Sequence, residues 1–278
     1  TTERNNADFN SRVATFQPSL RFPVGENSFL TVRGGFKSGE IFDVDEDSSV
    51  LLKDEEEDGE RALGFIGYSF SYDSRRTGLN PNAGVIFRFS QDFAGLGSDT
   101  SYIETTALLG AETRVLNEEV TLRATLEGGA LNMLSGDSLI LDRFRVGPSR
   151  LRGFESNGIG PRDLDADNED VLGGNFFAVA RLEAEFPLGL PEEYGVSGGV
   201  FYDMGSLWGL DNTDDGRIDD RFRLRSAVGV SLFWDTGLGP LRFNFAEAIQ
   251  KEDYDEDQFF DLTISTQFCC AIFFRLCL

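Results

Sequence analysis

Histidine is absent from this sequence, and cysteine is confined to its last ten residues. Its 278 residues include no histidine, so Ser–His and Cys–His nucleophiles and the usual histidine metal sites are excluded. The three cysteines, Cys269, Cys270 and Cys277, all follow residue 268, and no earlier cysteine exists to pair with them. The composition therefore argues against a hydrolase built on a Ser–His or Cys–His triad. For the chain as a whole we expect no enzymatic activity, no cofactor and no metal.

Carboxylates are the abundant ionisable groups, and they are concentrated in four runs. The runs 43–60, 163–170, 211–220 and 252–257 hold 25 Asp and Glu residues and two basic residues, a balance equal to the net charge of −23 of the whole chain. Such a charge argues against binding to nucleic acid. The first two runs lack the glycine that a helix-loop-helix calcium site requires at its sixth position. The runs are either solvated surface or sites of cation-mediated contact with lipopolysaccharide.

Alternation of apolar and polar residues with a period of two recurs along the whole chain. In segment 176–186, apolar residues alternate with Arg181, Glu183 and Glu185. This period indicates β-strands, and no segment of comparable length has the spacing of a helix. No stretch approaches the ~18 consecutive apolar residues that a membrane-spanning helix requires. The sequence therefore predicts an all-β protein.

The length and polarity of the strands favour a transmembrane antiparallel β-barrel over a soluble sandwich. Charged residues lie well inside the strands, and strands of about 9 to 13 residues suit a tilted crossing of a bilayer. The alternation predicts about eleven strands: 11–22, 28–42, 61–73, 83–93, 101–115, 119–131, 175–186, 196–208, 221–234, 240–249 and 258–268.

The acidic runs follow the second, sixth, eighth and tenth predicted strands, which places all four at the same end of an up-and-down sheet. The connections at the opposite end are shorter. Long polar loops at one end and short turns at the other are typical of an outer-membrane barrel. Barrels of single bacterial chains close with an even number of strands, so an odd count predicts that at least one strand lies outside this sequence.

The longest predicted connection, 132–174, contains GPSRLRGFESNGIGPRD, and here the sequence resembles a known family. Leu151, Arg152, Gly153 and Phe154 are similar to the (V/I)RGF motif of the BamA family, within a wider GxSxxRGFxxNxIGP pattern. The resemblance extends from about residue 61 to 268. Its further matches are YDSRRTGLNPNAG at 72–84, FAVARLEAEFPLGLP at 177–191, VFYDMGSLWGL at 200–210 and GPLRFNFAEAI at 239–249.

The resemblance implies that the long loop folds back into the barrel, where Arg152 pairs with Glu183 and Asp203. Alternation independently places both acidic residues on the polar face of their strands. Charge-assisted hydrogen bonds of this kind are each worth ~1.5–3 kcal/mol. The three residues either brace the loop or take part directly in the insertion of other barrels, and resemblance alone does not separate these roles.

The end of the chain carries a second candidate signal. Outer-membrane barrels commonly end at an aromatic residue that alternating apolar positions precede, and Phe260, Leu262, Ile264 and Phe268 reproduce this pattern. The same residues also fit an ordinary lipid-facing strand. The domain prediction is therefore a barrel over 1–268, followed by an anomalous cysteine-rich tail, 269–278, interpreted as an artefact of frameshift or read-through.

The resemblance implies that these strands are the sixth to sixteenth of a sixteen-stranded barrel in the outer membrane of a Gram-negative bacterium, with POTRA domains upstream. It also implies assembly and insertion of β-barrel proteins. The expected partners are outer-membrane lipid and lipopolysaccharide, unfolded outer-membrane clients, and assembly lipoproteins bound through the POTRA part. The alternatives are two-partner secretion or TamA-type translocation, a passive porin, and a soluble all-β binding protein or enzyme.

Overall fold

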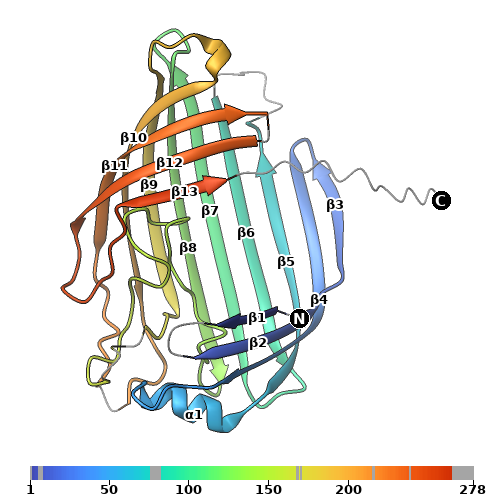
Figure 1. Cartoon of the computed structure of the whole chain (residues 1–278). Helices are drawn as coiled ribbons and strands as arrows, with labels where there is room; N and C mark the ends of the chain where they lie inside the picture. Colours follow the sequence, from blue (N-terminus) through green and yellow to red (C-terminus); the bar gives the residue numbers. More distant parts are fainter. Residues whose placement is uncertain are drawn as a thin grey trace.

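In the computed structural model, the described part of the chain forms thirteen antiparallel strands in one strongly curved sheet (Figure 1). The strand order is β1-β2-β4-β5-β6-β7-β8-β9-β10-β11-β12-β13, and β3 pairs separately with β4. From β4 onwards, neighbours in the sheet are thus neighbours in the chain, which is the up-and-down arrangement that the sequence predicts. The structure describes residues 2–5, 9–75, 83–166, 169, 171–214, 217–237 and 239–264.

The strands that build the wall are long enough to cross a bilayer at a tilt, since nine of them have 12 to 16 residues. The bounds are β1 Thr2–Asn5, β2 Asn10–Phe16, β3 Ser19–Gly25, β4 Ser28–Phe42, β5 Arg61–Asp73, β6 Ala83–Leu96, β7 Ser101–Val115, β8 Val120–Ser135, β9 Phe176–Pro187, β10 Val196–Trp208, β11 Arg225–Thr236, β12 Gly239–Gln250 and β13 Phe260–Ile264. Within the described part of the chain, no helix is long and apolar enough to span a membrane.

The first predicted strand, 11–22, is divided in the structure. The residues before Pro18 form β2 and those after it form β3, and both pair with β4. Proline has no N–H to donate to a sheet, and the Pro18 carbonyl accepts a hydrogen bond from the Gly34 amide at 3.3 Å. A Cβ at Gly35 would lie 1.9 Å from the Phe16 carbonyl oxygen. The two glycines therefore allow β4 to follow the break closely.

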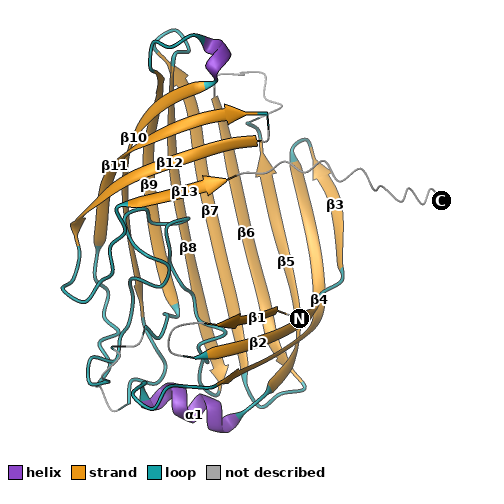
Figure 2. Cartoon of the chain, viewed as in Figure 1, coloured by secondary structure: helices purple, strands orange, loops and turns teal. Residues whose placement is uncertain are grey.

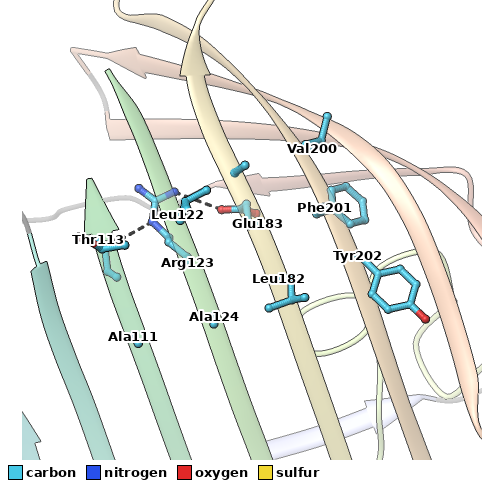
Figure 3. Close-up of a pocket in the computed structure, with 12 residues that line it drawn as sticks. Ala111, Thr113, Leu122, Arg123, Ala124, Leu182, Glu183, Val200, Phe201 and Tyr202 are labelled. Atoms are coloured by element: carbon cyan, nitrogen blue, oxygen red, sulfur yellow. Dashed lines mark hydrogen bonds and ion pairs between the residues drawn. The ribbon is translucent and has the colours of Figure 1, made fainter. Parts of the chain in front are cut away.

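The strands expose one face and bury the other, as alternation predicts. On β9, the side chain of Leu182 is 54% exposed, whereas Phe177 and Val179 on the opposite face are buried. Figure 3 shows part of this wall, where Leu122, Leu182 and Val200 belong to a shallow apolar hollow over β7 to β10. An apolar outer face and a buried polar and apolar interior are what a barrel in lipid requires.

The two ends of the sheet differ (Figure 2). Long loops and helix α1 (Val50–Asp58) gather at the end where β8 finishes, and the short 3-10 helix η1 (Glu192–Tyr194) lies at the opposite end. The described residues of the four acidic runs all lie at the first end, as strand parity predicts. Parts of the runs 163–170 and 211–220, together with most of the turn at 72–84, lie outside the described residues.

The interpretation of the run 43–60 as solvated surface is wrong for its middle. Residues 50–58 form α1, which buries Leu51, Leu52 and the carboxylate of Glu55. The two leucines pack with Ile140, Leu172 and partners from other loops in a small apolar cluster. The helix ends at Gly59, whose φ of +72° suits glycine. The helix could not be predicted from the sequence. Its only apolar residues are the consecutive residues 50–52, which are too few to show a helical period, and the others are charged.

Because Glu55 is buried, we predict that the docking of helix α1 onto the neighbouring loops depends on pH. Desolvation raises the pKa of Glu55 from 4.5 to about 7, although Arg143 opposes the shift. The folded state therefore prefers the protonated acid, so stability is highest below the ordinary pKa and is lost as the pH rises through 7. We expect docking of α1 to weaken by up to about 3 kcal/mol between pH 4.5 and 8.

Hydrogen exchange of the Leu52 amide, which donates to the Ser49 carbonyl at 3.1 Å, measures this docking. Glu55→Gln removes the titrating group and keeps an oxygen that can accept from the Ile140 amide, so its exchange should not show this pH dependence. An unmodified protein whose protection is constant over this range, after correction for intrinsic exchange, would contradict the prediction.

Candidate functional site

The connection between β8 and β9, residues 136–175, enters the interior of the curved sheet. Phe144, Val146, Leu151, Phe154 and Ile159 from this loop are buried against inward-facing residues of the wall. A long loop is usually on the surface, because its backbone groups need partners. Here the loop finds its partners inside the barrel, so it is a packed part of the lumen.

Two carboxylates of the wall hold Arg152. Its guanidinium donates from Nε to Asp203 Oδ2 at 2.6 Å and from Nη2 to Asp203 Oδ1 at 2.7 Å, a bidentate pair. Its Nη1 donates to Glu183 Oε2 at 2.6 Å. The Arg152 amide also donates to Asp203, and the guanidinium lies 3.6 Å from the centre of the Phe201 ring. The structure thus brings together the three residues that the resemblance groups.

The neighbours of Arg152 in the motif explain how the loop can approach the wall. Gly153 has a φ of +87°, and a Cβ there would lie 2.8 Å from the Cβ of Ala227 on β11. Leu151 and Phe154 are fully buried on either side. Glycine is therefore needed at 153 both for the backbone conformation and for the contact with a strand.

Glu183 also receives two further arginines. Arg123 on β8 donates to Glu183 Oε1 at 3.2 Å (Figure 3). It also donates to Glu185 Oε2 at 2.6 Å. Arg242 on β12 donates to the same Glu183 oxygen as Arg152. One carboxylate therefore joins the loop to strands on both sides of β9. The resemblance predicts only the contact with Arg152; the register of distant strands, which brings in the others, is not visible in the sequence.

Near its start, the loop is held by a carboxylate of its own, Asp142. It accepts from Lys37 Nζ at 2.9 Å and from the Tyr102 hydroxyl at 3.0 Å, and it pairs with Arg61. Burial alone would raise the pKa of Asp142, but the charges of Lys37 and Arg61 hold it below the ordinary value. Three wall strands, β4, β5 and β7, thus fix the start of the loop.

A fully buried ion pair fixes the last described loop. Arg225, at the start of β11, donates to both carboxylate oxygens of Asp255 at 2.8 and 2.9 Å. The Glu252 amide donates to Asp255 at 2.8 Å, so the loop between β12 and β13 is folded around this carboxylate. The sequence predicts a strand from 221, but β11 begins at Arg225 and residues 221–224 belong to no strand.

The aromatic end signal is described only in part. Phe260 and Leu262 lie on β13 with their side chains exposed, and the Phe260 ring lies 5.4 Å from the ring of Phe245 on β12. Ile264 is the last residue of β13. Phe268 and the tail 269–278 lie outside the described residues, so the predictions for them stay predictions. Within the described residues, no group of three or more metal-ligating side chains could hold a metal ion.

The wall and the inward-docked loop define an antiparallel β-barrel membrane protein of the outer-membrane type. The Omp85 superfamily domain matches residues 1–268, and the chain belongs to that superfamily. It is 33% identical, over 83% of its length, to the outer membrane protein assembly factor BamA of Neorickettsia risticii, of which it covers 30%.

The chain is also similar to more distant proteins. The chain is 27% identical, over 71% of its length, to the sorting assembly machinery 50 kDa subunit of Saccharomyces cerevisiae, of which it covers 41%. The crystal structure of BamA from Haemophilus ducreyi lacking POTRA domains 1–3 matches 93% of the chain with a TM-score of 0.78 and 20% identity. The chain covers 55% of that structure, a likeness that shows the barrel fold.

Proposed function

We propose that this chain is barrel sequence of an outer-membrane assembly factor that inserts β-barrel proteins into the outer membrane of a Gram-negative bacterium. The observation that carries the proposal is the loop docked inside the lumen, with Arg152 held by Asp203 and Glu183. Similarity to the assembly factor of Neorickettsia risticii over most of the chain supports the same function.

The proposed mechanism is not enzymatic. Among the described residues, β13 pairs with β12 alone, so its other edge presents backbone donors and acceptors. An edge of this kind can align an incoming strand by β-augmentation. In this mechanism the motif residues Leu151, Arg152, Gly153 and Phe154 hold the loop in the lumen. Of the end signal, Phe260, Leu262 and Ile264 belong to the strand that offers the edge, and Phe268 lies outside the described residues.

The partners we propose follow from the two faces of the wall. Exposed apolar side chains such as Phe36, Ile66 and Leu126 would face outer-membrane lipid, and the acidic loops lie at the end expected to meet lipopolysaccharide. Unfolded outer-membrane proteins would be the clients. Lipoproteins of an assembly complex would bind through POTRA domains.

The rival functions differ in what passes through or along the barrel. A passive porin needs an open lumen, and the buried loop core with its ion pairs argues against one. Secretion of a partner protein, or TamA-type translocation, uses a similar barrel and remains the alternative.

Reconstitution of the full-length protein in phospholipid vesicles tests the proposal. We expect an unfolded outer-membrane barrel, added in urea, to fold faster into these vesicles than into protein-free vesicles, as measured by heat-modifiable mobility on gels. A soluble passenger protein should not enter the vesicles. Equal folding rates with and without the protein would overturn assembly, and protection of the passenger from external protease would favour secretion.

A further inference from the structure

The motif loop makes direct backbone contacts with the loop that leads into β13. The Gln258 amide donates to the Gly153 carbonyl at 3.0 Å, and the Glu155 amide donates to the Glu256 carbonyl at 3.0 Å. The Glu256 amide donates back to the Gly158 carbonyl at 2.9 Å. The pairing is that of a short antiparallel bridge, centred on Phe154 and Asp257. It joins the motif to the residues immediately before the last described strand.

This bridge needs the glycines of the motif. A Cβ at Gly158 would lie 2.5 Å from the Glu256 carbonyl oxygen. A Cβ at Gly153 would lie within 3.3 Å of Ala246 on β12, in addition to its clash on β11. Any larger residue at either position would therefore push the loop away from the C-terminal hairpin formed by β12 and β13.

A second contact, an ion pair inside the lumen, holds the same hairpin. Arg242 of β12 pairs with Glu183 of β9, although β10 and β11 lie between these strands in the sheet. Three strand spacings amount to ~14 Å along the wall. The two side chains can therefore meet only because the wall is tightly curved between β9 and β12. Figure 1 shows this curvature, with β12 and β13 crossing in front of β7 and β8.

The Arg242 side chain is placed for this contact by the hairpin itself. Its Nε donates to Asn244 Oδ1 at 2.9 Å, and Asn244 donates to Asp261 of β13 at 3.1 Å. The guanidinium lies 4.9 Å from the centre of the Phe233 ring on β11. The chain of contacts therefore runs from Arg152 through Glu183, Arg242 and Asn244 to β13.

We propose that the motif loop is a clamp on the C-terminal hairpin, and that Arg242 is a positioning residue that sets where the open edge of β13 lies. The clamp consists of two contacts, which we call its jaws. One is the backbone bridge between the motif loop and the residues before β13, and the other is the Glu183–Arg242 pair, which the loop joins through the contact of Arg152 with the same Glu183 carboxylate. Release of either jaw lets the hairpin move relative to the rest of the wall. The use of this edge in assembly rests on the proposed function, whereas the clamp itself does not.

Pulsed electron-spin resonance on the full-length protein in phospholipid vesicles tests the clamp. Leu182 and Leu262 are exposed on the outer face, so spin labels at these positions lie on the opposite face of the strands from the clamped side chains. In Arg242→Gln we expect the distance distribution to broaden and its mean to move by about 5 Å, one strand spacing. Arg242→Lys keeps a charge and should restore part of the original distribution. Arg114→Gln, on an exposed arginine of β7, is the control and should change nothing.

Gly158→Ala opens the other jaw without touching the lumenal ion pairs, so it should move the Leu262 label even if Arg242→Gln does not fold. An unchanged distance distribution in folded Arg242→Gln, or in folded Gly158→Ala if Arg242→Gln does not fold, would overturn the clamp. Folding is checked by heat-modifiable mobility.

The rate of client folding then tests the link to assembly. We expect it to fall about tenfold in Arg242→Gln, the effect of one lost charge-assisted hydrogen bond. A moved label with an unchanged rate would overturn the role of Arg242 in assembly. An unmodified protein that does not accelerate client folding would overturn the proposed function, and the label distances would still decide the clamp.

Discussion

Replacing Arg152 by alanine in the full-length protein is expected to lower the free energy of unfolding of the barrel by about 3–5 kcal/mol. The reason is the carboxylate of Asp203, which is fully buried and takes its hydrogen bonds from Arg152. Removing the guanidinium leaves this charge in the lumen without its partner. Glu183 suffers less, because Arg123 and Arg242 still contact it.

This asymmetry predicts a result that simple loss of packing would not give. Asp203→Asn in the Arg152→Ala background should recover part of the lost stability, because it removes the uncompensated charge. Arg152→Lys should fall between the parent and Arg152→Ala, since an ammonium group cannot reproduce the bidentate fork. Urea unfolding in detergent micelles measures these differences, and the level of assembled barrel in cells should follow the same order.

Arg217→Ala is the matched control, because the Arg217 side chain is 62% exposed and its pair with Asp214 lies at the surface. Its effect should stay within about 0.5 kcal/mol. If Arg152→Ala were as stable as this control and supported normal growth, the motif arginine would not be important for the barrel.

Most of the wall can be predicted from the sequence, because alternation with a period of two shows which residues of each strand face inward. Glu183 and Asp203 lie on the inner face as alternation predicts, and the acidic runs share one end of the sheet as strand parity predicts. The resemblance adds the docking of Arg152. These features depend on local order along the chain, which a single sequence contains.

Contacts between distant parts of the wall could not be predicted in this way. The pair of Arg242 with Glu183 depends on the curvature of four strands, and the ion pair of Arg225 with Asp255 depends on how a loop folds over a strand end. Residues 50–58 were missed for a different reason. Their helix is stabilised by packing of Leu51 and Leu52 against other loops, and tertiary packing of this kind leaves little trace in local periodicity.

Together, the predicted and the unpredicted contacts hold the loop in the lumen at three places. Asp142 anchors the start of the loop to β4, β5 and β7, Arg152 anchors its middle to β9 and β10, and the bridge through Gly153 and Gly158 joins it to the C-terminal hairpin. Because each anchor joins different strands, the loop ties together parts of the wall that the sheet itself connects only through several neighbours. Loosening the loop should therefore affect the hairpin most, because strand pairing joins the hairpin to the rest of the described sheet through β11 alone.

Replacing Asp255 by leucine is expected to cost about 3–5 kcal/mol, the usual effect of breaking a buried ion pair. The side chains of Arg225 and Asp255 are only 1% and 0% exposed, so the remaining guanidinium would have no access to water. The double variant Arg225→Met with Asp255→Leu should be much closer in stability to the parent, because it removes both desolvated charges. A double-mutant cycle by urea unfolding measures the coupling.

The neighbouring pair of Lys251 with Asp257 supplies the control within the same loop. Its side chains are largely exposed, at 39% and 49%, and exposed pairs are worth about 0.2–1 kcal/mol. Asp257→Ala should therefore have a small effect, while the backbone bridge at 257 stays in place. Additive effects of Arg225→Met and Asp255→Leu would contradict the prediction, because the loop before β13 would then be held by packing alone. A large coupling energy would mean that this ion pair fixes the loop from which the last strand begins.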